Sequence, residues 1–354
     1  MYFRNFLLLL FVTLPSCRGY YQNSLDPNTS ERQTLLFLSS AYFTSKSNPF
    51  SSLKGIAIDA SKNLYVCDLH RIRKVSPSGF VTTLAGSTTS GFVDGTGTEA
   101  RFSSPGGLVL DSSGNVYVSD TENHSIRKIT PSGSVTTLAG NGVGGSGNGT
   151  GTAAYFQNPL GIAINASSEL FVADTGNYLI RKVTQEGTVS TYSGSGVSSY
   201  TDGTLTGGSF SNPGSISFDG SSSFYITDGN KIRKIDSSNL STVAGDGNSA
   251  YLNGSNLSSS FSSPQSIAYF NSVLYVSDTG NLRIRSVQSD GTVSLFSGSG
   301  DSGTVDGSPS LSRYSYPFGI VSDGSGSFYL TDSTYIRILG SDGSVRTLQA
   351  VSAE

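Results

Sequence analysis

The chain has 354 residues, with 22 lysines and arginines against 25 aspartates and glutamates, so its formal charge is −3. Charged residues make up 13% of it, well below the roughly 25% of ordinary soluble domains. A chain so close to neutral lacks the basic field that attracts nucleic acids and anionic lipids, so we expect no nucleic-acid partner. Its 43 glycines, 19 phenylalanines and 18 tyrosines are typical of many short strands joined by turns.

Residues 1–17 have the form of an export signal: the basic Arg4 is followed by an apolar run and then by small residues. The run is too short to span a bilayer. Its end, Leu14 to Cys17, resembles a bacterial lipobox, in which a signal peptidase cuts before a cysteine that then carries diacylglycerol; Pro15 departs from that pattern. We therefore predict an exported, cell-envelope protein with a lipid anchor on Cys17. A cleaved secretory signal and a retained anchor are the alternatives.

Residues 18–49 are interpreted as a tether or lead-in. The apolar segment Leu35–Leu38 could form an extra edge strand, and Leu35–Phe43 could form an additional sheet, although residues 50–350 contain six complete units without it. The second cysteine, Cys67, stands where the other units have a serine, alanine or threonine, so we interpret it as a small strand residue. No disulfide framework is expected, because the other cysteine lies in the signal region.

Residues 50–350 consist of six repeats of about 52 residues, which must be recognised before any motif is weighed. The repeats align on an aspartate that follows an aromatic, an aliphatic and a small residue. An Ile-Arg pair comes shortly after each aspartate, as in Ile180-Arg181. The six aligned aspartates are Asp68, Asp120, Asp174, Asp228, Asp278 and Asp332.

Each repeat contains four short runs with the alternation and the β-branched content of strands. Turn sequences such as Pro131-Ser132-Gly133 separate them. In the second repeat the predicted strands are Gly107–Asp111, Asn115–Ser119, Ile126–Ile129 and Ser134–Leu138. Four antiparallel strands repeated six times predict an all-β fold, a six-bladed β-propeller of four-stranded blades, whose closure leaves few exposed sheet edges.

The repeats resemble the NHL repeat, most clearly in Pro159–Ile164 followed by Phe171–Asn177. The resemblance extends over residues 50–350 and implies the same six-bladed propeller. It implies little about function, because similar propellers bind proteins, RNA or small molecules, or act as enzymes.

In a propeller blade the strands run from a, innermost, to d, outermost, so the b–c and d–a connections share one face. We call this the long-loop face; the short a–b and c–d turns form the other. Five d–a connections keep one spacing, 19 residues from a glycine to a proline, as from Gly140 to Pro159. Each contains an Asp-Gly or Asn-Gly pair, which predicts a turn, and an aromatic residue, which predicts a plug between blades. A calcium ring or ligand-stacking aromatics are the alternatives for this pattern.

The six aligned aspartates begin the b–c connections and are candidate binding residues for a cation or a polyhydroxylated ligand. Each also precedes an arginine by five or seven residues across a hairpin, as Asp174 precedes Arg181. Ion pairing or Asx-turn capping is therefore the alternative interpretation. The b–c connections of the first, fourth and sixth repeats are two residues shorter than the others, which could shape an off-centre groove.

Catalytic residues are not identified. The chain has only two histidines, His70 and His124, both in b–c connections, too few for a histidine-ligated zinc site. A calcium-dependent lactonase would need acidic and amide ligands at the channel mouth. The candidates end the inner strands on the short-turn side: Asp59, Asp111, Asn165, Asp219 and Asp323.

These observations predict an exported, lipoprotein-type, noncatalytic scaffold that acts as a monomer. It would bind a protein or glycan partner of the cell envelope through the long-loop face, where Tyr200 and Tyr251 are candidate contact residues. No cofactor or metal is required by this interpretation. The alternatives are a calcium-dependent hydrolase or lactonase acting at the channel mouth, and a mainly structural envelope protein.

Overall fold

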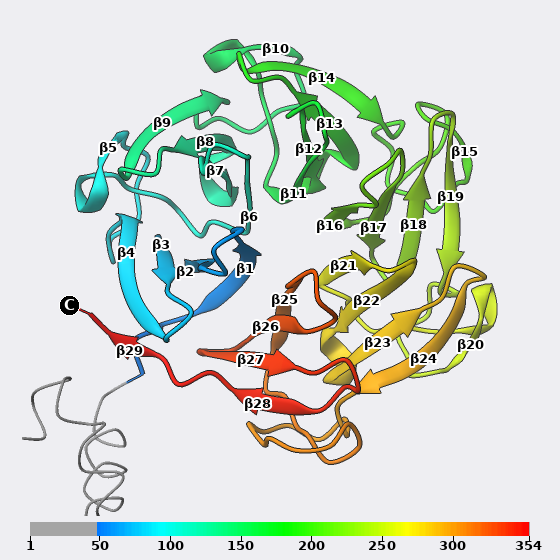
Figure 1. Cartoon of the computed structure of the whole chain (residues 1–354). Coiled ribbons are helices and arrows are strands. Elements are labelled where there is room, and N and C mark those ends of the chain that lie inside the picture. Colours follow the sequence, from blue (N-terminus) through cyan, green and yellow to red (C-terminus); the bar gives the residue numbers. More distant parts are fainter. Residues whose placement is uncertain (1–47, 354) are drawn as a thin grey trace, which may run out of the picture. The chain divides into compact units, whose positions relative to one another are not determined.

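Six antiparallel sheets follow one another along residues 48–353, the part of the chain that the computed structural model describes. They surround a common axis as the blades of a propeller, and their first strands line the centre (Figure 1). The predicted signal, the lipidation site Cys17 and the segment Leu35–Phe43 lie outside the described residues. The all-β, six-bladed propeller predicted from the repeats is confirmed.

Each blade contributes strands a to d in chain order. In blades 1, 2 and 3 they are β1 (Leu53–Ile58), β2 (Leu64–Asp68), β3 (Arg71–Val75) and β4 (Phe80–Gly86); β6 (Gly107–Leu110), β7 (Val116–Asp120), β8 (Ser125–Ile129) and β9 (Ser134–Ala139); and β11 (Pro159–Ile164), β12 (Leu170–Asp174), β13 (Leu179–Val183) and β14 (Thr188–Ser193). The strands of blade 2 agree with the prediction to within one residue at each end.

Blades 4, 5 and 6 repeat the pattern. Their strands are β16 (Pro213–Phe218), β17 (Phe224–Asp228), β18 (Lys231–Ile235) and β19 (Asn239–Ala244); β21 (Ser266–Phe270), β22 (Val273–Asp278), β23 (Arg283–Val287) and β24 (Thr292–Ser297); and β25 (Pro317–Ser322), β26 (Phe328–Asp332), β27 (Tyr335–Leu339) and β28 (Val345–Thr347).

Helical structure within residues 48–353 is limited to three-residue 3-10 turns. These turns are η2 (Gly97–Glu99), η3 (Thr121–Asn123), η4 (Gly151–Ala153), η5 (Thr175–Asn177), η6 (Asn256–Ser258) and η7 (Thr279–Asn281). Three of them, η3, η5 and η7, lie in the longer b–c connections of blades 2, 3 and 5, so the predicted difference in loop length is confirmed.

Five blades carry an additional strand or bridge at their outer edge. In blades 2 to 5, the d–a connection that precedes the blade pairs antiparallel with the beginning of that blade's strand d, as Thr96 pairs with Ser134. In blade 6, Gly307 makes a single bridge to Val345. The four short strands are β5 (Gly95–Thr96), β10 (Gly149–Thr150), β15 (Gly203–Thr204) and β20 (Gly254–Ser255). The Asp-Gly and Asn-Gly pairs, predicted to form turns, therefore begin edge strands instead in these four blades.

Blade 1 receives its edge strand from the other end of the chain. Strand β29 (Val351–Ser352) leaves blade 6 and pairs with Phe80 and Val81 at the beginning of β4, in parallel rather than antiparallel orientation (Figure 1). The Val351 and Ala353 amides donate to the carbonyl oxygens of Gly79 and Val81, at 2.9 and 3.0 Å. The ring is therefore closed by inter-blade packing and by this terminal strand.

The inner strands of neighbouring blades approach closely because glycines stand at their contact points. A Cβ on Gly161 of β11 would lie 2.3 Å from the carbonyl oxygen of Gly214 in β16. Between blades 6 and 1, the Leu53 amide donates to Ser333 and the Thr331 hydroxyl to Lys54, both onto backbone carbonyl oxygens. Six apolar clusters fill the spaces within and between blades, so the hydrophobic core forms a ring rather than a centre.

Candidate binding surfaces

The six aligned aspartates are fully buried and ion-paired. In blade 3, Asp174 Oδ1 accepts the Gln157 amide at 2.7 Å, and Asp174 Oδ2 accepts Arg181 Nη1 and Asn177 Nδ2, both at 2.8 Å. All six side chains have 0% exposure. Both oxygens are occupied by donors of the same chain, so a ligand from solvent has no access to them. The ion-pair interpretation describes all six: Asp68, Asp120, Asp174, Asp228, Asp278 and Asp332.

Burial changes the acidity of several of these carboxyls. Desolvation raises the pKa of Asp120 to about 6, because removal from water penalises the charged form more than the Asn123 amide and Arg127 stabilise it. The pKa values of Asp174 and Asp278 are raised for the same reason. Hydrogen bonds to the charged carboxylates oppose this shift only in part, and all of them come from the same chain, so these pairs serve the framework.

In blades 2 to 6, the paired arginine also holds the d–a connection that precedes its blade. Arg127 Nη2 donates to the Val93 carbonyl oxygen at 3.0 Å and to Asp94 Oδ1 at 2.6 Å. The Thr137 amide and hydroxyl in turn donate to Asp94, both at 3.1 Å. Asp94, the first residue of the Asp-Gly pair, thus ties the edge strand to the blade. The hydrogen bonds of this side chain, and not a turn geometry, explain why an Asp or Asn recurs at the position.

The recurrent aromatic of each d–a connection is buried against this arginine. Phe156 has 0% exposure, and its ring centroid lies 5.5 Å from the Arg181 guanidinium carbon. The predicted plug is confirmed at all five positions, Phe102, Phe156, Phe210, Phe261 and Tyr314. These rings are therefore not available to stack on a ligand.

The two histidines fasten neighbouring blades. His70 Nδ1 accepts the Ser104 amide and His124 Nδ1 accepts the Asn158 amide, each at 3.1 Å, from the d–a connection of the next blade. In blade 4, Asn230 Oδ1 accepts the Ser263 amide at 2.9 Å in the same way. These bonds place the b–c and d–a connections together on the long-loop face, as expected.

The acidic and amide residues that end the inner strands cap their own turns. Asp111 Oδ1 accepts the amides of Ser113 and Asn115, both at 2.9 Å, and Oδ2 accepts Asn115 Nδ2 and the Tyr117 hydroxyl at 2.8 and 3.1 Å. These hydrogen bonds lower the pKa of Asp111 despite partial desolvation. Asp59 has the same arrangement with Asn63 and Tyr65.

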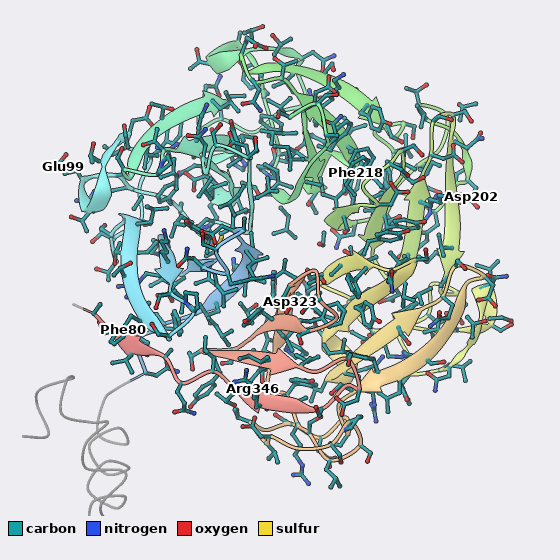
Figure 2. The ribbon with its side chains drawn as sticks, viewed as in Figure 1. Phe80, Glu99, Asp202, Phe218, Asp323 and Arg346 are labelled. Carbon is teal, nitrogen blue, oxygen red and sulfur yellow. The ribbon has the colours of Figure 1, made fainter. Side chains whose placement is uncertain are left out.

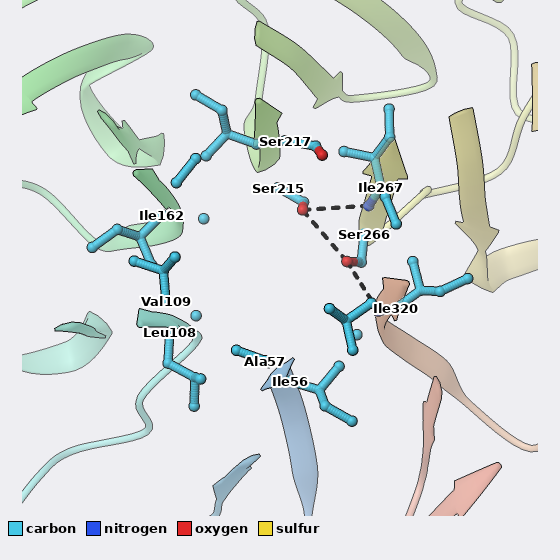
Figure 3. A pocket seen from close by; sticks show the side chains of 18 of the residues that line it. Ile56, Ala57, Leu108, Val109, Ile162, Ser215, Ser217, Ser266, Ile267 and Ile320 are labelled. Carbon is cyan, nitrogen blue, oxygen red and sulfur yellow. Dashed lines mark hydrogen bonds between the residues drawn. The ribbon is translucent and has the colours of Figure 1, made fainter. Parts of the chain in front are cut away.

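A central cavity of about 350 Å³ is enclosed by the inner strands (Figure 3). Its walls are mainly aliphatic, with Ser215, Ser217 and Ser266 on one side. The serine oxygens accept amides of the next blade, as Ser217 accepts the Tyr269 amide at 3.1 Å. No carboxylate, imidazole or thiol lines this cavity.

Calcium or zinc therefore has no fitting donor set there, because both ions need several oxygen, nitrogen or sulfur ligands. Within residues 48–353, no three histidine, cysteine, aspartate or glutamate side chains are grouped as metal ligands. The same residues include no helix that is both long and apolar enough to cross a membrane.

The long-loop face carries exposed apolar groups. Eleven of the fourteen exposed large hydrophobic side chains of the described residues lie in d–a connections. Tyr251, 38% exposed, covers Arg283 with a ring-to-guanidinium distance of 4.0 Å. Tyr200 is half-buried; its hydroxyl accepts the Asn230 amide at 3.3 Å, and Lys231 Nζ lies 5.0 Å from its ring. Of the two predicted contact tyrosines, Tyr251 is thus the more accessible.

The d–a connections reach the rim of the molecule, and Figure 2 shows Asp202 of one such connection at the outside. Asp323, which follows the inner strand β25, lies near the axis in the same view. Sequence reasoning missed the apolar lining of the central cavity and the serines in it. Their signal was the alternation of each inner strand, whose alternate side chains face the axis.

Comparison with known proteins identifies the repeat. The model of the NHL repeat matches residues 102–129. Over 91 residues the chain is 41% identical to protein SUPPRESSOR OF QUENCHING 1 of Arabidopsis thaliana, and over 95 residues 39% identical to NHL repeat-containing protein 2 of Bos taurus. These segments cover 25% and 26% of this chain, but only 9% and 13% of the two relatives.

Solved structures share the fold at low identity. An auxiliary nutrient binding protein from Bacteroides thetaiotaomicron has a TM-score of 0.62 at 16% identity, over 84% of this chain and 69% of that one. A gluconolactonase from Xanthomonas campestris has a TM-score of 0.54 at 12% identity, over 85% and 87%. A chain of a nidogen–laminin complex has a TM-score of 0.56 at 17% identity, over 81% and 92%.

Residues 102–129 match the NHL repeat, and the six blades repeat the same aligned residues, so the class that fold and repeat define is a six-bladed β-propeller that contains an NHL repeat. At these identities the solved structures establish the architecture alone.

Proposed function

We propose that this protein is an exported, lipid-anchored, noncatalytic scaffold that binds a protein or glycan partner of the cell envelope through its long-loop face. The observation that carries the binding role is the division between buried and exposed groups. The charged residues that recur in every blade are locked in internal pairs, whereas large apolar side chains of the d–a connections face solvent. Apolar and aromatic groups exposed over a rigid support are what a binding surface requires.

The framework supports such a role because each connection is fastened at several points. Arg181, for example, binds the Tyr155 carbonyl oxygen at 3.1 Å and Asn148 Oδ1 at 2.7 Å, both in one connection. Connections held in this way present their exposed groups with little conformational freedom, which lowers the entropic cost of association. The proposed export and lipid anchor rest on the sequence of residues 1–17.

The central cavity does not favour a hydrolase acting at the channel. The gluconolactonase shares only the fold, and the central cavity of this chain has no acidic or histidine lining.

The binding role is tested with the full chain, purified in detergent, and isolated cell-envelope fractions. We expect the double variant Tyr251→Ala with Tyr316→Ala to weaken binding at least tenfold, because both rings are exposed on the long-loop face. The matched control is Phe80→Ala, which removes a ring that is 54% exposed on an outer strand, away from that face. Equal loss in both variants, or in neither, would contradict the proposal.

Anchoring is tested separately with Cys17→Ser and metabolic labelling by a fatty-acid analogue. We expect wild-type protein to be labelled and to fractionate with membranes, and the variant to be unlabelled. Labelling that persists in the variant would remove Cys17 as the attachment point.

A further inference from the structure

A second cavity, of about 490 Å³, opens on blade 3 between the b–c connection and the two neighbouring d–a connections. Its polar walls come from Ser146, Asn177, Tyr178, Thr191, Ser195 and Thr206. We refer to it as the blade-3 pocket. Its size is within the range of about 300–1,000 Å³ that is usual for small-molecule sites.

The pocket exists because blade 3 lacks an aromatic ring that other blades have. Two residues before the Asp or Asn of the d–a connection, blades 2, 4 and 5 have Phe92, Tyr200 and Tyr251, whereas blade 3 has Ser146 and blade 6 has Thr304. In blade 2 the Phe92 ring lies 4.9 Å from Arg127.

A glycine three residues after the end of strand d shows where the ring would lie. The Phe92 ring is 3.3 Å from where a Cβ on Gly142 would stand, and the Tyr200 ring is 3.8 Å from the same point on Gly247. The equivalent residue of blade 3 is Gly196, which lines the pocket and has only the Asn177 carbonyl oxygen nearby, at 3.9 Å. The repeats thus serve as internal controls: the same position is filled in blades 2 and 4 and open in blade 3.

A second difference leaves a hydroxyl available. In blades 2, 4 and 6 an aspartate accepts a threonine hydroxyl of strand d, as Asp202 accepts Thr242 at 2.9 Å. Blade 3 has Asn148 at that position, and the Thr191 hydroxyl makes no hydrogen bond to any described residue. The side chains of Ser146, Tyr178 and Thr206 likewise make none within residues 48–353.

We propose that the blade-3 pocket binds a neutral sugar unit. Its lining has no charged side chain, which disfavours ionic ligands, and the unpaired hydroxyls match the donor and acceptor groups of a sugar ring. The space is one that a flat six-membered ring fills in blade 2. This inference rests on the proposed binding role of the long-loop face and names the ligand class for one part of it.

The test is calorimetric titration of the full chain with glucose, galactose, mannose, N-acetylglucosamine, maltose and cellobiose. We expect at least one to bind with one site per chain. Ser146→Phe restores the ring of blade 2 and should weaken that binding at least tenfold. The matched control Val143→Phe adds the same ring at a position of the same connection that is 60% exposed and does not line the pocket, and it should change affinity less than threefold. Thermal melting of each variant checks that the fold is retained.

A second variant, Asn148→Asp, should also weaken binding, because the new carboxylate would accept the Thr191 hydroxyl as Asp94 accepts Thr137. It remains informative if Ser146→Phe does not fold. Absence of binding by all six sugars, or binding that neither variant weakens, would overturn the assignment. Binding of N-acetyltyrosinamide instead of the sugars would overturn it in favour of an aromatic side chain of a protein. The double variant Tyr251→Ala with Tyr316→Ala distinguishes the two proposals. If it loses envelope binding and still binds the sugar, the sugar site and the proposed envelope-binding role are tested independently.

Discussion

Arg181 Nη1 and Asp174 Oδ2 are 2.8 Å apart in blade 3, and neither side chain is reached by solvent. The pair joins strands b and c, while the second nitrogen of the guanidinium holds the connection that arrives from blade 2. One arginine thus links two neighbouring strands of a blade to a connection that lies 33 residues earlier in the chain. The same geometry recurs in blades 2 to 6, so these five blades share one internal fastening.

Removing one partner of this pair should destabilise the protein strongly. We expect Asp174→Ala to lower the free energy of unfolding by about 3–5 kcal/mol, because it leaves the buried Arg181 charge without its carboxylate. Urea denaturation measures the change. The control is Asp301→Ala, whose partner Arg313 lies 3.4 Å away and whose side chain is 66% exposed, and which should cost less than about 1 kcal/mol. Similar losses in both variants would contradict the assigned role of burial.

Stability should depend on pH through Asp120. Its pKa is about 6 in the folded chain and 3.8 as an ordinary carboxyl, so between these values the folded state binds more protons. The stability contributed by the protonated group is present below pH 4 and is lost as the pH rises through 6, by up to about 1.4 kcal/mol per pH unit.

The measurement compares wild type with Asp120→Asn in urea from pH 4 to 7. We expect the advantage of the wild type to shrink as the pH rises over this interval. An advantage that grows with pH would mean that the ionised pair with Arg127, and not desolvation, dominates this carboxyl.

The inner strands should not tolerate a side chain at their closest approach. Gly161→Ala would place a Cβ 2.3 Å from the Gly214 carbonyl oxygen, forcing β11 and β16 apart at a cost of about 1–3 kcal/mol. Gly203→Ala is the control, because its nearest backbone neighbour, the Gly208 nitrogen, would be 3.5 Å from the new Cβ. Thermal melting should show a lower Tm for the first variant alone; an unchanged Tm there would show that the inner strands can separate freely.

The terminal strand should protect the edge of blade 1. Deletion of residues 349–354 removes β29, and we expect a lower Tm together with faster hydrogen exchange along β4. The matched variant Val351→Pro removes one amide donor, the bond to the Gly79 carbonyl oxygen, and should have a smaller effect. If the deletion leaves both the Tm and exchange in β4 unchanged, the strand does not contribute to closure.

The repeat architecture could be predicted from the sequence because the residues that recur in each repeat are regularly spaced and chemically distinct. An aspartate with an arginine across the hairpin, as in Asp174 and Arg181, indicates an ion pair without coordinates, and the pair is observed. The terminal strand was not predictable. It pairs through only two residues, in parallel orientation, and Val351 and Ser352 have no sequence pattern that distinguishes them from a tail.

The blade-3 pocket was hidden for a different reason. Ser146 is an ordinary loop serine until the positions of Phe92 and Tyr200 show what fills the equivalent space. A cavity made by the absence of a ring leaves no motif of its own. The role of Asp94 was also missed, because the Asp-Gly pair is typical of a turn and its long-range bonds to Arg127 and Thr137 depend on the fold.

Strand β29 pairs a segment that follows blade 6 with blade 1, which is synthesised five blades earlier. During synthesis, blade 1 leaves the ribosome with β4 as an unpaired outer edge, and residues 351 and 352 cover it only after all six blades have been produced. A chain interrupted before residue 351 therefore exposes a strand edge open to pairing with other chains. Synthesis as far as β29 is thus a condition for a blade 1 that resists aggregation.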